Sequence, residues 1–552
     1  MVRVTPSIHS VDADRFGILR MSSPPETHSS ASGRVNTEPF PEGAQQARTW
    51  PAWLVLVLIV LVRIPFLLVH PLQEDAYITF RAAQHFAEYG DFSFNLHQHF
   101  PGTTSLLYPL IVAAIDLVSR SYMVLGVQLF GTLCIAGACW FIARALCSRP
   151  AEQYILLLLT ACWPIALVMS YTGMETPLLA LTLGISIFAL ARESHWTLFA
   201  ASVLVLPLVR PDAIAYGLIF CAAMFFIHRR AAVLGSAALV AGCGLFLLGT
   251  RLTTGHFLPT TARAKEIAYH PDHSAVAVAG RVRDLFLSHS FLLPSPTNYL
   301  IKLSPLVLVV VAGAFVLAFR YAHSRRERVV LGTLAFATVA IPLAYAYGGV
   351  LFSWYLYPAN WIATAVTIAV LVRLAARSRF PVVGMSLLAV VSIGLIFMQW
   401  TKALAGSTQD YHYRGDIGRY LAAISHGQGT LFLEPAGLIP YFSGLQTDDE
   451  IGLVSSRVTD YMQRDPDAWW FDYVAAEQPD YIVERQSFDH YRTIEGYTLT
   501  PDQQRWFDAH YQLLRRVHYV PATYHPSPFL QKFLAMGPME DYLIYGRRSA
   551  AR

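Results

Sequence analysis

The chain has 552 residues, of which 54% are hydrophobic and only 14% are charged. Soluble globular proteins carry about one quarter charged residues, so this composition excludes an ordinary soluble protein and predicts a large membrane domain with smaller parts outside it. The formal net charge is only +4, so the placement of the basic residues matters more than their excess.

Residues 1–48 are polar, and they contain no apolar stretch like that of a cleavable signal peptide. We expect them to form a disordered cytoplasmic tail. Eleven apolar runs follow, each near the roughly 20 residues that a helix needs to cross about 30 Å of hydrocarbon. They lie near 51–70, 122–147, 152–170, 174–192, 195–209, 212–228, 231–250, 303–320, 328–346, 351–373 and 380–400. The apolar segment 104–119 carries Asp116 and is either a short span or a membrane-embedded juxtamembrane helix.

Basic residues predict which ends of these runs face the cytoplasm. Five clusters follow alternate runs: Arg144 with Arg149, Arg192, His228 to Arg230, Arg320 to Arg328, and Arg373 to Arg379. Cytoplasmic loops are enriched in Lys and Arg, so we place all five clusters inside. Eleven spans then alternate without conflict if 104–119 does not cross, with the N-terminus in the cytoplasm and the C-terminal region outside.

This topology predicts a transmembrane domain at 49–400, with outer loops at 71–103 and 251–302. The inner loops are short and contain neither a P-loop nor a GxGxxG motif, which argues against a cytosolic reaction of a nucleotide or nucleotide sugar. The expected fold is mainly α, a polytopic bundle of about eleven transmembrane helices with additional juxtamembrane helices.

Residues 401–552 are more polar than the apolar region before them, and we expect them to form a small α/β domain outside the membrane. The segments 429–434 and 479–484 are short, apolar and bounded by Gly or Pro, as buried strands are. Helices are expected near 413–425 and 502–512.

The first outer loop begins with two adjacent carboxylates, Glu74 and Asp75, ahead of an expected amphipathic helix that carries Arg81. A carboxylate at the membrane surface can take a proton from an acceptor hydroxyl, or it can help to hold a metal beside a phosphate. The alternative is structural: Asp75 could be the N-cap of the helix, with its side chain bonded to free backbone N–H groups.

Polar residues also interrupt the apolar runs at two later points on the same side. Glu175 precedes Pro177, so it is either a site residue or the start of a helix. Arg210 and Asp212 flank a proline between two runs. An arginine there usually faces a polar cavity because exposure to lipid is costly, although Arg210 and Asp212 could equally form a structural ion pair.

Cations gather after the run at 231–250, at Arg251, Arg263 and Lys265, beside the hydroxyls of Thr260 and Thr261. Arg and Lys are the natural partners of a phosphate, and these cations are therefore candidates for binding a phosphorylated donor. The alternative is contact with anionic lipid headgroups.

Aromatic residues cluster at Trp354, Tyr355 and Tyr357, where they either stack on a sugar or form an interfacial belt. Acids, cations and aromatics thus share the outer side of a chain without a nucleotide-binding motif. That combination suits transfer from a donor already in the membrane, such as a polyprenyl-phosphate sugar. A cation would stabilise the charge on the departing phosphate while a base activates the acceptor hydroxyl.

Nine segments, in this order, resemble those of a known family. They are Glu74–Arg81, Gly90–Asn95, Gly102–Ser105, Gly173–Leu178, Arg210–Asp212, Leu258–Lys265, Tyr355–Pro358, Glu434–Gly444 and Ile451–Leu453. Together they resemble a bacterial polytopic glycosyltransferase family of the GT-C fold. That family includes the mycobacterial terminal arabinofuranosyltransferases, which use decaprenyl-phosphoryl-arabinofuranose, and the pilin arabinosyltransferases. The resemblance covers residues from about 50 to about 490 and is specific only as a set.

The resemblance implies that Asp75 is the catalytic base or the carboxylate closest to it. Family members usually carry two Asp residues here, and this chain has Glu74 in place of the first, which leaves the division of roles between Glu74 and Asp75 open. Glu434 likewise stands where an Asp is common. The fold class implies an inverting displacement. The implied donor-phosphate residues are Arg210, Arg263 and Lys265.

The remaining candidates for substrate binding are Arg81, Glu175, Asp212, Trp354, Tyr355 and Tyr357. A divalent cation (Mg²⁺, Mn²⁺ or Ca²⁺) could bind near Glu74, Asp75 and Glu175, although no ligand spacing demands one.

The sequence therefore predicts a glycosyltransferase of a bacterial cytoplasmic membrane, with its site and C-terminal domain in the periplasm. It would move a sugar, D-arabinofuranose by the resemblance, from a polyprenyl-phosphate donor to a polysaccharide or protein of the cell envelope. No nucleic-acid partner is expected. Two alternatives stay open, a flippase that moves lipid-linked sugars and an inactive scaffold for envelope enzymes.

Overall fold

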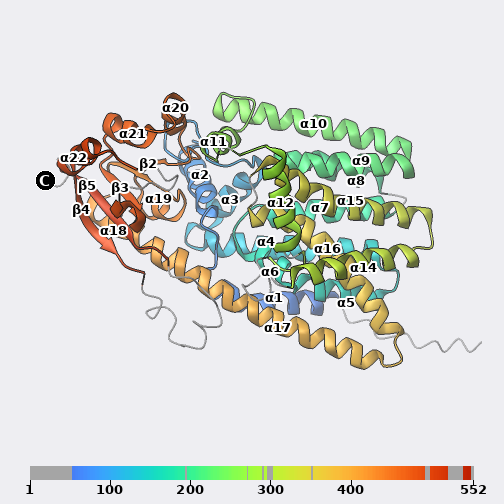
Figure 1. The fold of residues 1–552 in the computed structure, drawn as a ribbon. Coiled ribbons are helices and arrows are strands. Elements are labelled where there is room, and N and C mark those ends of the chain that lie inside the picture. Colours follow the sequence, from blue (N-terminus) through green and yellow to red (C-terminus); the bar gives the residue numbers. More distant parts are fainter. Residues whose placement is uncertain are drawn as a thin grey trace, which may run out of the picture. The chain divides into compact units, whose positions relative to one another are not determined.

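The computed structural model describes residues 52–192, 195–269, 271–288, 291–294, 303–349, 352–490, 498–519 and 539–548. The expected tail at 1–48 lies outside these residues. The chain from Trp50 onward forms one compact unit, in which helices run side by side and a small sheet lies beyond one end of them (Figure 1).

Each of the eleven predicted apolar runs contains an apolar helix or a bent pair of helices. These helices are α1 (Ala52–Leu68), α4 (Met123–Leu146), α5 (Pro150–Ala161) with α6 (Pro164–Tyr171), α7 (Thr176–Ala191), α8 (Trp196–Val209), α9 (Ile214–Ile227), α10 (Arg229–Thr254), α14 (Ser304–Tyr321), α15 (Arg325–Gly348), α16 (Ser353–Arg377) and α17 (Pro381–Ser407). Their agreement with the predicted runs confirms a mainly helical membrane bundle.

Six helices of the described chain are long and apolar enough to cross a membrane, or seven if the bent pair α5–α6 is one span. The four other predicted spans are apolar helices of 17 residues or fewer. The segment predicted at 104–119 is the helix α3 (Leu107–Val118), which has 12 residues. At 1.5 Å per residue it covers only about 18 Å, which favours the juxtamembrane alternative.

The run predicted at 152–170 is not one straight helix, because α5 and α6 meet at a bend of 60°. Pro164 opens α6 and has no N–H to continue the hydrogen bonding of α5. Arg63 of α1 is buried beside the bend and donates hydrogen bonds to Ala161 O at 2.7 Å and Ser170 Oγ at 3.0 Å. A polar side chain from another helix thus satisfies backbone that the bend leaves open.

The C-terminal residues form a five-stranded sheet in the order β2-β1-β3-β5-β4. The strands are β1 (Thr430–Leu433), β2 (Gln446–Asp449), β3 (Tyr481–Arg485), β4 (Tyr511–Val517) and β5 (Tyr542–Arg547). β1 pairs in parallel with β2 and β3, whereas β5 pairs antiparallel with β3 and β4. The predicted strands at 429–434 and 479–484 are therefore confirmed as β1 and β3.

Side chains alternate between the two faces of this sheet, as the pleat requires. Leu431 and Leu433 of β1 pack on one face with Ile417 of α18 (Gly415–Ser425). Phe432 packs on the other face with Trp470 of α21 (Trp469–Glu477). The smaller helices around the sheet are α19 (Leu438–Ser443), α20 (Arg457–Arg464) and α22 (Pro501–His510). The sheet thus has an apolar layer on each face.

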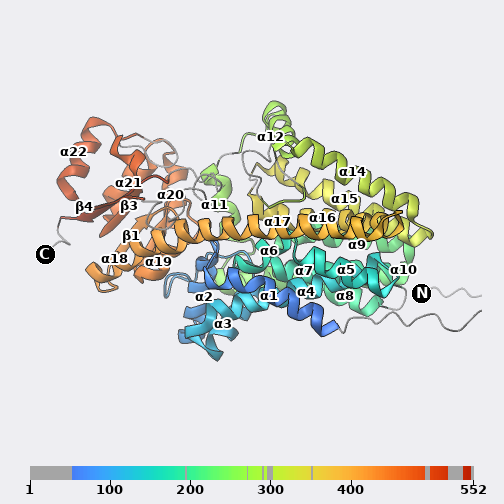
Figure 2. The same cartoon turned by 90° about the horizontal axis from the view of Figure 1, so that it is seen from below.

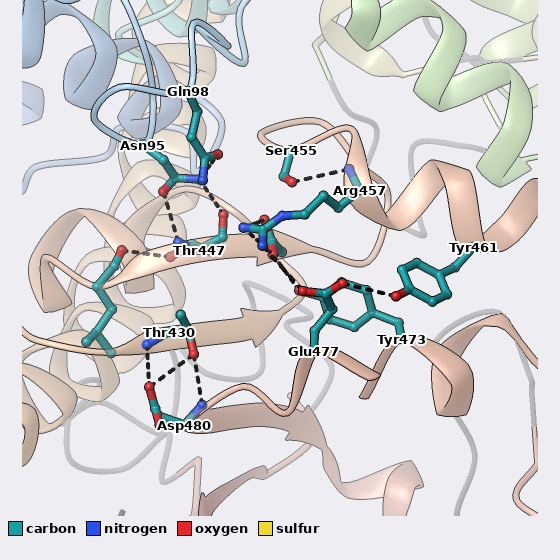
Figure 3. Close-up of polar contacts among 12 residues, drawn as sticks. Asn95, Gln98, Thr430, Thr447, Ser455, Arg457, Tyr461, Tyr473, Glu477 and Asp480 are labelled. Atoms are coloured by element: carbon teal, nitrogen blue, oxygen red, sulfur yellow. Dashed lines mark hydrogen bonds and ion pairs between the residues drawn. The ribbon is translucent and has the colours of Figure 1, made fainter. Parts of the chain in front are cut away.

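The connection through α17 and the docking of the first loop both hold the sheet against the helices. In Figure 2, α17 runs along the bundle and leads into α18 beside the sheet, through a π-helical segment at Thr408–Arg414. The first loop docks on β2, where the Asn95 amide donates to Thr447 O at 2.7 Å and accepts from Thr447 N at 2.9 Å (Figure 3). Figure 3 also shows Arg457 and Tyr461 of α20 reaching Glu477 of α21, which joins the helices beside this strand.

Candidate functional site

Asp75 lies in the turn between α1 and the short helix α2 (Ala76–Tyr89). It occupies the N-cap position, but its side chain makes no capping hydrogen bond, so the N-cap alternative is wrong. The carboxylate instead lines two cavities, one of about 310 Å³ and one of about 420 Å³. Trp354 is shared by both cavities as well. Asp75 therefore stands where the two cavities adjoin.

The first cavity brings together residues from widely separated parts of the chain. Those predicted from the sequence are Asp75, Glu175, Arg210, Asp212, Lys265, Trp354 and Tyr355. Those that the sequence reasoning missed include Thr79, Thr103 and Tyr345. Thr261, which stood beside the predicted cations, lines it too, and its buried hydroxyl has no hydrogen-bond partner among the described residues. The cavity wall is thus mixed: cationic, acidic, aromatic and hydroxylic.

Arg210 is held by two carboxylates. Its Nε and Nη2 bind the two oxygens of Asp212 at 3.0 and 2.8 Å, and its Nη1 binds Glu175 Oε1 at 3.1 Å. The structural ion pair offered as the alternative for Arg210 and Asp212 is therefore present, and it forms part of the cavity wall. Because both partners are acidic, the charge of Arg210 is already compensated before any ligand arrives.

Lys265 is the cation of this cavity that carries no such compensation. Its Nζ donates to the Tyr355 hydroxyl at 2.7 Å and lies 5.4 Å from the centre of the Tyr355 ring. Within the described ranges, no carboxylate lies at ion-pair distance from Lys265. A compact ammonium held by neutral aromatic groups is well suited to attract a phosphate.

Tyr345 fixes the aromatic wall to the ion pairs. Its ring stacks on Tyr355 at 5.1 Å between centres, and its hydroxyl donates to Asp212. The sequence offered a signal for this residue, because Tyr345 is polar and lies near the outer end of an apolar run. Its role could not be inferred from the sequence alone, since Asp212 lies on another helix.

Glu74 turns away from the first cavity toward the sheet. One of its oxygens accepts hydrogen bonds from the backbone N–H groups of Gly437 and of Leu438, the latter at 2.9 Å. Gly437 is required here, because a β-carbon at this position would lie 2.1 Å from Glu74 O. Glu74 therefore ties the turn that carries Asp75 to the start of α19, and its extra methylene relative to Asp lengthens its reach.

Burial and mutual repulsion make Glu74 and Asp75 unequal. Burial, and then the charge of Asp75, raise the pKa of Glu74 well above its ordinary value. Burial also raises the pKa of Asp75, but Lys265 and a hydrogen bond from Glu74 oppose that rise. Two adjacent carboxyl groups in one low-dielectric site hold a proton between them. The two carboxyl groups therefore titrate as a pair, in which the pKa of Glu74 is raised well above its ordinary value while Lys265 and Glu74 oppose the rise for Asp75.

The second cavity contains three charged residues that the sequence reasoning missed, Lys402, Asp410 and Arg414. Its polar lining also includes Glu74, Asp75, Tyr357, Gln399 and Glu434. Arg414 pairs with Asp410 at 2.8 Å, and Glu434 pairs with Arg485 at 2.7 Å. The available signal was Lys402 and Asp410 just beyond the last apolar run. The sequence pattern assigns residues 401–552 to a separate domain. The π-helical segment of this region nevertheless places Asp410 and Arg414 on the wall of the same cavity as Asp75.

Three predicted residues line neither cavity. Arg251 is exposed on α10 with its guanidinium 5.7 Å from the centre of the Phe257 ring. Arg263 is exposed and donates to Gln463 of α20 at 3.2 Å. Arg81 is buried and donates to the backbone carbonyls of Phe94, Pro440 and Leu445 at 2.9, 2.7 and 2.7 Å. Arg81 therefore joins α2 to the sheet region. These cations lie on the helices α2, α10 and α11, and their spacing in the sequence could not predict where their side chains point.

The carboxylates suggested for a metal do not form a ligand set. Glu74 is occupied by backbone N–H groups and Glu175 by Arg210. The described part of the chain contains no group of three or more His, Cys, Asp or Glu residues placed to hold a metal ion. Asp75 lines both cavities, yet Glu175 lies on the wall of the first and Glu74 on that of the second. These three residues do not fit the octahedral oxygen shell that Mg²⁺ requires.

Comparison with known proteins shows which structures share the fold of this chain. Residues 402–535 match a domain of unknown function (DUF8728), and no curated protein sequence matches the chain. The Archaeoglobus fulgidus oligosaccharyltransferase in its apo form is similar over 91% of this chain and 89% of its own, with a TM-score of 0.55 and 10% identity. The same organism's oligosaccharyltransferase AglB, in complex with an inhibitory peptide and a dolichol-phosphate, is similar over 90% and 88%, with a TM-score of 0.54 and 10% identity.

ArnT from Cupriavidus metallidurans, in a structure with bound undecaprenyl phosphate, is similar over 91% of this chain and 100% of its own. Its TM-score is 0.52 at 11% identity. At such identities the likeness shows the fold alone. The chain has the polytopic fold of the GT-C membrane glycosyltransferases, with a small α/β region after its last apolar helix.

Proposed function

We propose that this protein is a membrane glycosyltransferase that moves a sugar from a polyprenyl-phosphate donor to an acceptor hydroxyl, with Asp75 as the base. The observation that carries this proposal is the position of Asp75 where two cavities adjoin, with Lys265 in one of them and no carboxylate of the described residues at ion-pair distance from it. A base that reaches two separate cavities can serve two substrates that meet at one point. The fold is shared with a protein in complex with a dolichol-phosphate and with a protein bound to undecaprenyl phosphate, which supports the class of donor.

The first cavity is the better match for the donor. Lys265 supplies a positive charge for the phosphate, and the free hydroxyl of Thr261 supplies a hydrogen bond. Trp354 and Tyr355 present aromatic faces that suit a sugar ring or an isoprenoid unit. Arg210 is already neutralised, so we assign it to holding the cavity wall and to secondary contact with the phosphate.

The second cavity then takes the acceptor. Its carboxylates, amide and tyrosine hydroxyl form the hydrogen-bonding set that a polyol needs. In the reaction, Asp75 removes the proton of the acceptor hydroxyl, whose oxygen attacks the anomeric carbon of the donor sugar. The bond from that carbon to the phosphate oxygen breaks, and the phosphate leaves with its charge beside Lys265. A single displacement of this kind inverts the anomeric centre.

The finer assignments come from the sequence resemblance. We propose D-arabinofuranose as the sugar and a cell-envelope polysaccharide or protein as the acceptor. We also propose that both cavities and the region 401–552 lie in the periplasm, because the basic helix ends lie at the other end of the bundle. The region 401–552 borders the second cavity through Arg414 and Glu434, so it would contribute to acceptor binding.

The test uses purified protein, synthetic polyprenyl-phosphoryl-arabinofuranose and a panel of glycan and pilin acceptors. We expect Asp75→Asn to lower transfer by about 10²–10⁴, the usual contribution of a positioned base. The matched control is Asp460→Asn on α20, an exposed carboxylate away from both cavities, which should leave the rate unchanged. Full activity of Asp75→Asn with a normal unfolding temperature would refute the proposal.

The flippase alternative needs a path for the lipid headgroup between the two membrane faces. The cavities beside Asp75 share no lining residue with those at the opposite end of the bundle. Between the lining residues Tyr357 and Val366, the residues 358–365 of α16 are all buried. Translocation of a fluorescent polyprenyl-phosphate sugar in liposomes, without transfer to any acceptor, would favour the flippase instead.

A further inference from the structure

A second group of charged residues surrounds a cavity at the end of the bundle opposite the sheet. This cavity of about 320 Å³ is bordered by the last residues of α4, α7, α14 and α16 and the first residues of α5 and α15. Its wall contains five arginines and two glutamates, which leaves three positive charges unbalanced. The arginines are Arg149, Arg192, Arg326, Arg373 and Arg377. An adjoining cavity of about 450 Å³ shares Arg192 and Arg326 and adds Arg325.

Backbone contacts fix several of these guanidinium groups at the cavity wall. Arg192 donates to Arg144 O at 2.5 Å, Arg373 donates to Leu146 O, and Arg326 donates to Leu190 O at 2.9 Å. An arginine has five N–H donors, so one contact to a helix end orients the group and leaves donors for a ligand. These side chains are therefore held in place before a ligand binds.

The two glutamates do not neutralise the arginines held in this way. Glu327 accepts from His323 N at 2.8 Å and belongs to the capping box at the start of α15. Glu152 is paired with Arg149 at 3.8 Å. Among the residues that the structure describes, neither Arg192 nor Arg373 has a carboxylate within 4 Å. The excess positive charge thus lies beside these two arginines.

One part of the cavity wall is apolar. It is formed by Val330 and Leu331 of α15 and by Val366, Ala369 and Val370 of α16, whereas Ser148, Tyr321, His323 and Ser324 add polar groups elsewhere on the wall. A cavity with fixed cations at its rim and aliphatic side chains within matches a phosphate attached to a hydrocarbon chain. A general excess of arginine on the cytoplasmic side would require neither the cavity nor the backbone contacts that orient its cations.

We propose that this cavity is a binding site for an anionic membrane phospholipid, separate from the site around Asp75. The lipid phosphate binds Arg192 and Arg373, and part of an acyl chain lies against the wall of α15 and α16. Occupation of the site joins the ends of α4, α7 and α16 through one ligand, which stabilises the folded bundle by mass action.

The experiment measures lipid binding to the purified, delipidated full chain by native mass spectrometry. The probes are dioleoylphosphatidylglycerol and, for comparison, zwitterionic dioleoylphosphatidylcholine, while inorganic phosphate is tested by the shift in unfolding temperature. The variants are Arg192→Gln with Arg373→Gln, and a control of equal net charge, Arg229→Gln with Arg230→Gln. The control residues begin α10 and line neither of the two cavities.

We expect the anionic lipid to bind the wild type and the control alike, and to bind the Arg192/Arg373 variant about tenfold more weakly or worse. A further variant, Ala369→Phe, keeps every arginine and fills the apolar part of the cavity, so it should also weaken lipid binding. It tests the site independently if the Arg192/Arg373 variant folds poorly. Equal affinity for the two lipids, or equal losses in both double variants, would overturn the site. Phosphate alone stabilising the protein as strongly as the lipid would overturn the role of the acyl chain.

Discussion

Lys265 does two things for Asp75. Its charge opposes the effect of burial on the pKa of the Asp75 carboxyl, and it offers a partner to the departing phosphate. Glu74 adds a hydrogen bond to Asp75 and is itself fixed by the backbone of Gly437 and Leu438. The base is thus controlled by one residue 190 positions later in the chain and by a second that is tied to the sheet region.

Replacing Lys265 should therefore change the pH dependence of transfer as well as its rate. A base is active above its pKa and loses activity as pH falls through it. In Lys265→Met the opposing charge is gone, the pKa of Asp75 rises, and the acidic limb of kcat/KM moves to higher pH. The matched control is Arg263→Met on the same helix, α11 (Thr260–Tyr269), whose side chain lines neither cavity. An acidic limb that stays in place would contradict the electrostatic effect of Lys265 on Asp75.

At the level of elements, the bundle tolerates broken and short helices because other side chains complete their hydrogen bonds. The bend between α5 and α6 lies at Cys162 and Trp163, and Arg63 reaches it from α1. A buried arginine inside an apolar helix is costly unless its nitrogen atoms have hydrogen-bond partners. Arg63 uses Nε, Nη1 and Nη2 in hydrogen bonds to Ser170, Ile59 and Ala161.

We expect Arg63→Met to lower the unfolding temperature of the detergent-solubilised protein by several degrees. The reason is that the buried Ala161 O loses its charged donor and Ser170 Oγ keeps only its bond to Leu167 O, at a cost of about 1–3 kcal/mol for a buried group left unsatisfied. Arg251→Met, which removes an exposed arginine from α10, should change that temperature little. An unchanged temperature in Arg63→Met would mean that the bend is stable without the arginine.

For the molecule as a whole, the sheet region and the helices meet around α2. Arg81 is the main polar connection, because its three hydrogen bonds reach the first loop, α19 and the residue before β2. Asn95 adds two more to β2, and Glu74 adds those to the start of α19. These contacts position Asp75 between the cavity near α15 and the cavity near α17.

Breaking this connection should loosen the sheet region and slow transfer together. In Arg81→Gln we expect faster backbone hydrogen exchange at residues 437–447, because the carbonyls of Pro440 and Leu445 lose a charged donor. Arg120→Gln is the control, since that arginine is exposed and joins α2 to α3 without touching the sheet. Equal exchange in Arg81→Gln and the wild type would show that the other contacts are sufficient.

Much of the fold could be predicted from the sequence because hydrophobic pattern is a local property. All eleven apolar runs contain helices, and β1 and β3 lie where the short apolar segments predicted strands. Once the spans alternate, the loop residues at one end must share a side, which explains why Glu175, Arg210 and Lys265 gather with Asp75. The bend at Pro164 could not be predicted from hydrophobicity, because the apolar run at 152–170 continues through it.

Only the tertiary structure decided which of those residues face a cavity. Arg81, Arg251 and Arg263 carry the same charge as Lys265 and were predicted on the same side of the membrane. In the structure, however, Arg81 binds backbone carbonyls, Arg251 lies against the Phe257 ring, and Arg263 binds Gln463. The second cavity depends on α17 carrying Asp410 back to Asp75, more than 300 positions earlier in the chain. Composition and pattern act over a few helical turns, whereas the direction of a side chain and its distant partner are set by packing. For this reason the sequence determined the helical bundle, while the tertiary structure determined the site.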